Sequence, residues 1–188
     1  MRVAKAIGWL KKWLEQIGSP AFGLLYFFIF AQNNTKLARS YPLFSHEYFM
    51  TKALDLAIEA YDKGEIPVGA IVVADGSKII GKGYNQTELL TDVTAHAEIL
   101  AITAASQFLG AKYLKNCTLY VTLEPSVMCA GALAWSQIDR IVYGASDTKR
   151  GFGVYSRKII HPKTELIGGI LEKDCEALMK NFFKDLRT

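Results

Sequence analysis

Along residues 47–84 the pattern of apolar and polar positions changes: it first has the period of a helix and then that of β-strands. Within residues 47–62 the small apolar residues Ala53, Leu56, Ala57 and Ala60 recur at helical spacing. Residues 66–74 and 78–84 are rich in β-forming side chains. Asp75-Gly76-Ser77 separates these two runs and is typical of a hairpin turn. The pattern predicts a helix followed by a β-hairpin.

Helical and strand patterns then alternate to the end of the chain. Residues 96–109 contain many good helix formers and end at Gly110, which favours a helix terminus. The later segments are strands 117–123, 140–145 and 165–167 and helices 126–137 and 172–187. Strands that alternate with helices form a sheet covered on both faces. We therefore predict an α/β protein with a three-layer α/β/α architecture around a central mixed five-stranded sheet.

The first 45 residues differ from this pattern, and we assign them to an extension ahead of a globular domain at 46–188. Residues 20–31 form an apolar run preceded by Lys11 and Lys12. The run is shorter than the roughly 20 residues of a transmembrane helix, although its basic flank imitates a secretory signal. A mis-started, a disordered and a membrane-associating extension remain open as interpretations. We rank a signal peptide below the first two and keep a short membrane-associating anchor as a further possibility.

The net charge of +4 says little about binding partners, because it comes from the extension. Residues 1–45 carry six Lys/Arg against Glu15, whereas the rest of the chain carries 16 Lys/Arg against 17 Asp/Glu. Local charge is more informative. The acid-free stretch 149–163 holds five basic residues that are candidates for RNA contacts: Lys149, Arg150, Arg157, Lys158 and Lys163. A solvated loop is the alternative interpretation of this stretch.

Candidate chemistry lies at the predicted starts of helices 96–109 and 126–137. His96-Ala97-Glu98 and the later Pro125-Ser126-Val127-Met128-Cys129 follow the H-x-E…P-C-x-x-C signature of zinc-dependent nucleobase deaminases. In that signature a His and two Cys bind Zn²⁺, and the Glu moves protons without binding the metal. His96 and Cys129 are therefore candidate metal ligands, and Glu98 is the candidate catalytic acid/base.

The third ligand position holds Ser126, where the signature has a cysteine. A serine hydroxyl stays protonated near neutral pH and is a harder, weaker donor than a thiolate. Serine is also a preferred N-cap, so the helix tolerates it. The other thiols, Cys117 and Cys175, lie in a predicted strand and a predicted C-terminal helix. Neither is placed near the site by the sequence, so we expect impaired zinc binding. Three unpaired cysteines also suit a reducing cytoplasm.

From residue 47 to 187 the chain resembles the bacterial tRNA-specific adenosine deaminases, members of the cytidine deaminase-like superfamily. The resemblance rests on these segments: GEIPVGA (64–70), GYN (83–85), DVTAHAE (92–98), TLEP (122–125), MCAGA (128–132), IVYGA (141–145), DTKRG (147–151) and FF (182–183). It implies conversion of the wobble adenosine of tRNA to inosine, a Zn²⁺ cofactor and a homodimer that binds the anticodon loop. It also implies that Asn85 contacts the base; a turn residue is the alternative.

Two other functions stay open at this point. Guanine and cytosine deaminases share the zinc motif, so a free-base substrate is one alternative. A zinc-poor, non-catalytic relative that binds RNA is the other, because of Ser126. A single substitution does not distinguish natural drift from deliberate inactivation or a sequence error. A tRNA enzyme works in the cytoplasm, and export would separate it from its substrate, which is the reason for the low rank of a signal peptide. We expect no obligate membrane partner.

Overall fold

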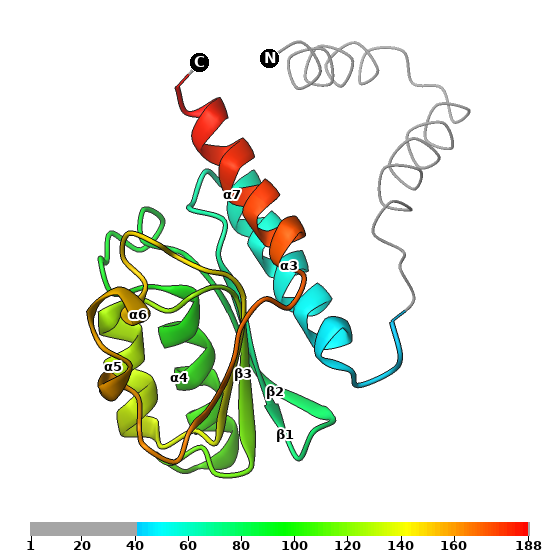
Figure 1. Cartoon of the computed structure of the whole chain (residues 1–188), viewed down its shortest axis with the longest axis vertical. Helices are drawn as coiled ribbons and strands as arrows, with labels where there is room; N and C mark the ends of the chain where they lie inside the picture. The colour runs from blue at the N-terminus through cyan, green and yellow to red at the C-terminus, as the bar shows by residue number, and fades with distance from the viewer. Residues whose placement is uncertain (1–40, 188) are drawn as a thin grey trace. The chain divides into compact units, whose positions relative to one another are not determined.

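The computed structural model describes residues 41–187, so the apolar run at 20–31 lies outside the described residues. Helix α3 (His46–Asp62) begins at Ser45, whose Oγ accepts a hydrogen bond from the N–H of Tyr48 at 3.1 Å. One face of this helix is buried, as its spacing predicted: Phe49, Met50, Ala53, Leu54, Ala57 and Ala60. The helix lies along the sheet in Figure 1.

Five strands form one mixed sheet, which confirms the predicted fold class. In chain order they are β1 (Gly69–Ala74), β2 (Lys78–Tyr84), β3 (Cys117–Leu123), β4 (Arg140–Ala145) and β5 (Glu165–Ile167). The strand order is β2-β1-β3-β4-β5. β1 pairs antiparallel with both β2 and β3, whereas β4 is parallel to β3 and β5. The carboxyl ends of β3 and β4 therefore lie at the same edge of the sheet.

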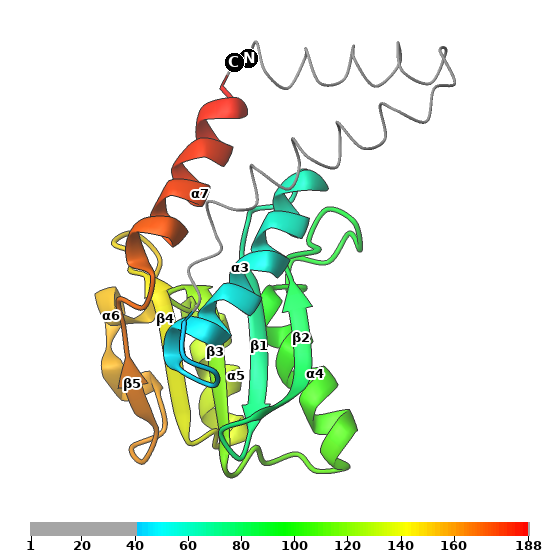
Figure 2. The same ribbon diagram turned by 90° about the vertical axis from the view of Figure 1, so that its right-hand side faces the viewer.

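Helices cover both faces of the sheet (Figure 2). Helices α4 (Ala97–Leu109) and α5 (Val127–Ser136) contribute to one hydrophobic cluster, and α3 and α7 (Glu172–Asp185) contribute to the other. All six residues of β1 are buried, because alternate side chains enter the two clusters. Ala70 and Val72 face α4 and α5, whereas Ile71 and Val73 face α3.

Helix α4 packs directly on β2 because two glycines remove the side chains between them. A Cβ on Gly83 would lie 2.4 Å from the carbonyl oxygen of Ala97, and one on Gly81 would lie 2.3 Å from that of Ala101. No side chain fits at such distances. The close approach fixes the start of α4 beside the end of β2, where the candidate site begins.

Two short helices in the basic stretch were not predicted from the sequence. They are α6 (Phe152–Tyr155) and the 3-10 helix η2 (Arg157–Ile159). Both are too short to show a helical period, and burial of Phe152 and Ile160 holds this segment against the core. Of the helices in residues 41–187, none is both long and apolar enough to span a membrane.

Candidate active site

Helix α4 begins beside β2, and a side chain from outside the helix satisfies its first backbone donor. Asn85 is buried just after β2, and its Oδ1 accepts a hydrogen bond from the N–H of Ala97 at 2.9 Å. His96 occupies the N-cap position, one residue before the helix that the sequence predicted to include it, and makes no capping bond. Because Asn85 supplies the capping acceptor, the imidazole of His96 is available to the site.

Glu98 lies in the first turn of α4 and is only 3% exposed. Burial raises the pKa of this carboxyl group from 4.5 to about 7, against hydrogen bonds from its own N–H and from Cys129. Its Oε2 is the one buried side-chain oxygen or nitrogen of residues 41–187 without a hydrogen-bond partner. A carboxyl group that titrates near neutral pH with one free oxygen is suited to proton transfer.

Helix α5 is capped by its own N-cap residue, Ser126. Ser126 has extended backbone angles, and its Oγ accepts a hydrogen bond from the N–H of Cys129 at 3.3 Å. The helical turn that follows buries Cys129 completely and places its Sγ 3.5 Å from Nδ1 of His96. Burial raises the pKa of the Cys129 thiol and lowers the pKa of His96. In the absence of a metal, burial thus favours the neutral form of both groups.

The distances fit a zinc ion at two protein ligands. Zinc bonds of about 2.0 Å to nitrogen and about 2.3 Å to sulfur, at a tetrahedral angle, separate the two atoms by about 3.5 Å. Nδ1 of His96 and Sγ of Cys129 are 3.5 Å apart. Ligand atoms of His96, Glu98 and Cys129 all lie within 4.8 Å of one another, the one such cluster that includes a cysteine or histidine in the described part of the chain. Glu98 contributes a carboxylate oxygen to this cluster, and its Oε2 has no hydrogen-bond partner.

The residue at the third ligand position, Ser126, suits a zinc ion less well than His96 and Cys129 do. The hydroxyl of Ser126 is a weak zinc donor, and it is already engaged with the N–H of Cys129. The remaining thiols lie elsewhere. Cys117 begins β3 at the opposite end of the strand from Ser126, and Cys175 is buried on α7 against the other face of the sheet. Neither belongs to the cluster with His96, so no thiol replaces the missing one.

The five basic candidates are all exposed, and the structure separates them. Ser126 forms an isolated β-bridge with Gly151, which brings the neighbouring Arg150 and Lys149 to the edge of the site. Arg157 and Lys158 lie on η2, which packs against α5. Lys163 precedes β5, whose first residue pairs with the start of β4, so it lies at the opposite end of the sheet from Ser126. The structure therefore does not bring Lys163 to the site.

Comparisons with known proteins agree with this geometry. Residues 44–187 match the family model of the MafB19-like deaminases. A tRNA-specific adenosine deaminase of Aquifex aeolicus is 44% identical over 147 residues, which are 76% of this chain and 96% of that protein. The chain belongs to the tRNA-specific adenosine deaminase family. The resemblance drawn from the sequence is therefore confirmed.

Two solved structures of deaminases share this fold. One is a tRNA:A34 deaminase, which performs A-to-I editing at the wobble position of transfer RNA. It superposes with a TM-score of 0.65 at 38% identity, over 70% of this chain and 98% of that one. The other is a guanine deaminase from Bacillus subtilis, with a TM-score of 0.53 and 42% identity over 55% of this chain and 66% of that one. Identity alone does not separate the two substrates.

Two carboxylates near the site were missed by sequence reasoning. Glu65 is 1% exposed and accepts hydrogen bonds from Thr87 Oγ1 and from the backbone N–H groups of Glu88 and Leu89. It holds the loop that runs from Asn85 towards His96. Glu124, between β3 and Pro125, holds the loop after β4 in a similar way. Each is an acid in a mostly apolar segment close to a predicted strand, and this is the signal that could have found them.

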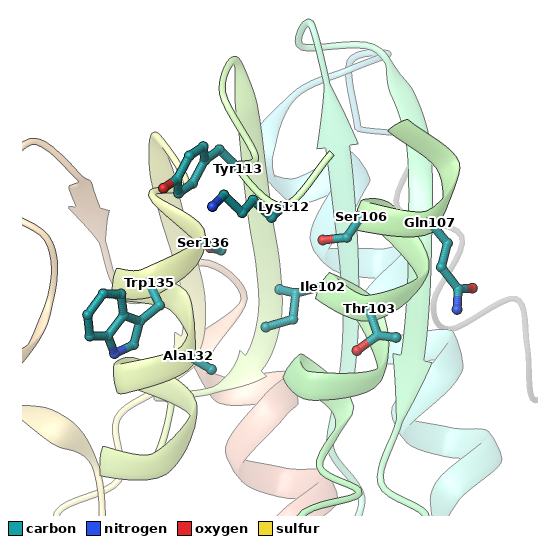
Figure 3. A pocket seen from close by; sticks show the side chains of 9 residues that line it. All are labelled: Ile102, Thr103, Ser106, Gln107, Lys112, Tyr113, Ala132, Trp135 and Ser136. Atoms are coloured by element: carbon teal, nitrogen blue, oxygen red, sulfur yellow. The ribbon is translucent and has the colours of Figure 1, made fainter. Parts of the chain in front are cut away.

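A surface groove in the described residues lies away from this chemistry. It is a groove of about 620 Å³ between the carboxyl halves of α4 and α5. Figure 3 shows Ile102 and Thr103 of α4 opposite Ala132 and Trp135 of α5, with Tyr113 at one end. Trp135 is 84% exposed, which is unusual for so large an apolar side chain. None of the metal-cluster residues lines the groove, so it lies apart from the candidate active site.

Proposed function

We propose that this chain is a zinc-dependent hydrolase that deaminates the wobble adenosine of tRNA to inosine, with its activity impaired by Ser126. One observation carries the proposal: His96 and Cys129 lie at zinc-ligand separation beside the buried Glu98, in a chain of the tRNA adenosine deaminase family. The reaction consumes water and releases ammonia from the purine ring. Zinc, the cytoplasmic location and the roles of individual residues are parts of this proposal.

His96 and Cys129 would hold the zinc ion, and Ser126 occupies the third ligand position. When bound, zinc would lower the pKa of a coordinated water and so provide a hydroxide-like nucleophile near neutral pH. Because the Ser126 hydroxyl is a weak donor that caps α5, the unmodified chain would bind zinc weakly. Replacing Ser126 with Cys would complete the His/Cys/Cys ligand set of the deaminase signature.

Glu98 moves the protons in this mechanism. Its Oε2, which has no partner in the protein, accepts a proton from the attacking water and delivers it to the ring nitrogen. The carboxylate then takes the second proton of the added water, from the hydroxyl on the ring carbon, and gives it to the leaving amine, which departs as ammonia. The raised pKa, about 7, means that the group can take and give a proton with little free-energy cost at neutral pH. Oδ1 of Asn85 already accepts the N–H of Ala97 at the start of α4. Its Nδ2 is therefore the group that would orient the purine.

The anticodon loop of tRNA is the proposed partner, and the basic loop is its proposed contact. A flexible loop exposes a base at lower cost than a duplex, so the wobble base reaches a buried Glu98 more readily. Lys149 and Arg150 at the edge of the site would meet phosphates near the target base. Arg157 and Lys158 would extend this contact. Of the five basic candidates, Lys163 is expected to contribute least because of its position.

A homodimer is also part of the proposal, with the groove between α4 and α5 as its contact surface. Trp135 stands exposed beside this groove, and burying it against a second copy would remove a large apolar surface from water. Trp135→Lys should give a monomer in sedimentation or multi-angle scattering. A monomeric parent chain would contradict the dimer.

The proposed domain boundary places an extension at 1–45 and the deaminase domain at 46–188. Residues 42–184 form one compact unit that contains the whole sheet and both helical layers. A chain that starts at Ser45, whose hydroxyl caps α3, should therefore be soluble and unfold cooperatively. A broad, non-cooperative transition would show that the extension is integral to the domain.

The substrate is tested with the Ser126→Cys chain. This variant should deaminate an anticodon stem-loop that carries a wobble adenosine far faster than free adenosine or guanine, and its binding should weaken as salt rises. The relative from Bacillus subtilis makes guanine deamination the second candidate. Preference for guanine over the stem-loop would replace the tRNA assignment. RNA binding without turnover in the Ser126→Cys chain would favour a non-catalytic binding protein.

A further inference from the structure

The carboxylate of Glu124 joins two segments that border the candidate site. Glu124 follows β3 and directly precedes Pro125 and Ser126, the segment that carries the third ligand position. Its Oε2 accepts the N–H of Asp147 at 3.1 Å, and its Oε1 accepts the N–H of Gly153 at 2.9 Å. One side chain therefore holds both ends of the loop 147–153. Bonds from N–H groups to a charged carboxylate are stronger than neutral ones.

The loop is built closely around this carboxylate. A Cβ on Gly151 would lie 2.6 Å from Oε2 of Glu124, and a Cβ on Gly153 would lie 2.7 Å from Oε1. Neither glycine has a positive φ, so lack of space and not backbone conformation disfavours a side chain there. At Gly151 the carbonyl oxygen of Asp147, at 2.6 Å, limits the space as well, whereas at Gly153 the closest atom belongs to Glu124. The loop also contacts the ligand segment directly. Phe152 donates its N–H to the carbonyl of Pro125 at 2.9 Å, and Gly151 pairs with Ser126.

The other side of the loop presents the basic residues nearest the site. Oδ1 of Asp147 accepts the backbone N–H groups of Lys149 and Arg150 at 2.9 and 3.0 Å. The N–H of Asp147 is itself bound to Glu124. A continuous set of hydrogen bonds thus runs from Glu124 to the backbone of the two basic residues. Movement of the carboxylate would shift them together with Gly151, the residue that pairs with Ser126.

We propose that Glu124 is a positioning residue that couples the metal-ligand segment 126–129 to the RNA-contacting loop 147–153. Zinc affinity and RNA affinity then depend on the same carboxylate. Binding of RNA to Lys149 and Arg150 would restrict the motion of segment 126–129. Binding of the metal would in turn restrict the motion of loop 147–153. This inference rests on the proposed function for its two ligands, but the coupling is a property of the protein alone.

The test uses the full Ser126→Cys chain with Glu124→Gln as the second change. Glutamine keeps the shape of the side chain but lacks the charge and one of the two acceptor oxygens. Asp139→Asn is the matched control, because Oδ2 of Asp139 also accepts a backbone N–H, from Asn116 at 2.9 Å, at the start of β4 far from the site. Zinc affinity is measured by competition with a chelator, and RNA affinity with a stem-loop in metal-loaded protein.

Glu124→Gln should weaken both affinities by about tenfold, the loss expected for one hydrogen bond to a charged group. Asp139→Asn should leave both unchanged. Gly153→Ala places a methyl group against the same carboxylate and should reproduce both losses. This second variant shows whether the effect of Glu124→Gln comes from a folding defect. A change in only one affinity, or an effect equal to that of Asp139→Asn, would overturn the coupling.

Amide hydrogen exchange in the unmodified chain tests the coupling without zinc or RNA. Glu124→Gln should speed exchange at Asp147 and Gly153, because glutamine keeps one acceptor oxygen for these two N–H groups, and also at Cys129, whose N–H is bound to Ser126. Faster exchange confined to Asp147 and Gly153 would mean that the carboxylate fastens only the loop. If the Ser126→Cys parent binds neither zinc nor RNA, the proposed function fails, and this exchange measurement still decides the coupling.

Discussion

The starts of α4 and α5 meet at one site, yet the two helices obtain their caps in opposite ways. At α4 the capping acceptor is Asn85, which comes from the end of β2, and the N-cap residue His96 has no capping role. At α5 the N-cap residue Ser126 accepts the bond itself, from the N–H of Cys129. A cap supplied from outside leaves the N-cap side chain for chemistry. A cap supplied by the N-cap residue uses that side chain.

This difference explains why the fold accommodates Ser126 while the zinc site does not. Serine is among the best N-cap residues, so α5 gains or keeps stability with it. The same hydroxyl gives zinc a weak donor in place of a thiolate. Helix stability and metal affinity therefore make opposite demands on position 126. They make no such conflicting demand on His96, because Asn85 caps α4.

The largest effect is expected at the start of α4, in the Ser126→Cys chain. Glu98→Gln should lower kcat by about 10²- to 10⁴-fold, because the amide cannot carry a proton. Stem-loop affinity should change little, since Glu98 is buried and contacts no phosphate. Single-turnover kinetics and binding on the same RNA separate the two quantities. Glu176→Gln on α7 is the control and should keep full activity; retention of activity in Glu98→Gln would remove Glu98 from its proposed role.

Two substitutions at Asn85 separate its capping of α4 from its proposed contact with the purine. Asn85→Asp keeps an acceptor for the N–H of Ala97 but removes the Nδ2 donors, so it should preserve stability and lower kcat/KM. Asn85→Ala removes both and should also cost about 1 kcal/mol of unfolding free energy. Urea unfolding and steady-state kinetics of the two variants provide the measurements. Equal stability of both would show that Asn85 does not cap α4.

The cap on α5 is tested in the unmodified chain by removing the hydroxyl. Ser126→Ala should lower the unfolding free energy by about 1 kcal/mol, because the N–H of Cys129 loses its acceptor. Ser126→Cys in metal-free buffer should be destabilised too and should recover on addition of zinc. Urea unfolding with and without zinc measures both. A fully stable Ser126→Ala would contradict the capping role.

A smaller effect is the pH dependence of stability in metal-free protein. Burial raises the pKa of Glu98 from 4.5 to about 7, so the native state binds a proton that the unfolded state releases. Glu98 therefore favours folding at low pH, and this contribution is lost as pH rises from about 4.5 to about 7. The pKa of His96 is lowered from 6.5 by burial, so this group acts in the opposite direction and its contribution to stability rises as pH approaches 6.5. Glu98→Gln should remove the loss at higher pH in urea titrations; an unchanged profile would contradict a raised pKa.

Local patterns predicted the elements well, and they failed where distant residues decide the structure. Strand β4 has the predicted bounds 140–145, because its run of apolar residues is a local signal. The spacing of His96, Glu98 and Cys129 also identified the cluster before its geometry was known. The capping by Asn85 and the loop contacts of Glu124 join residues 12 or more positions apart. Such contacts have no periodic signal, and neither does the separation of Lys163 from the other basic candidates.

Zinc content most directly tests whether Ser126 acts as a cap instead of a ligand. The unmodified chain and Ser126→Cys are purified in the same way and analysed for metal per chain. We predict well below one zinc per chain in the unmodified protein and one in Ser126→Cys, because the thiolate completes the set with His96 and Cys129. One tightly held zinc in the unmodified chain would contradict this account. It would mean that Ser126 leaves the N–H of Cys129 to bind the metal, or that another ligand replaces it.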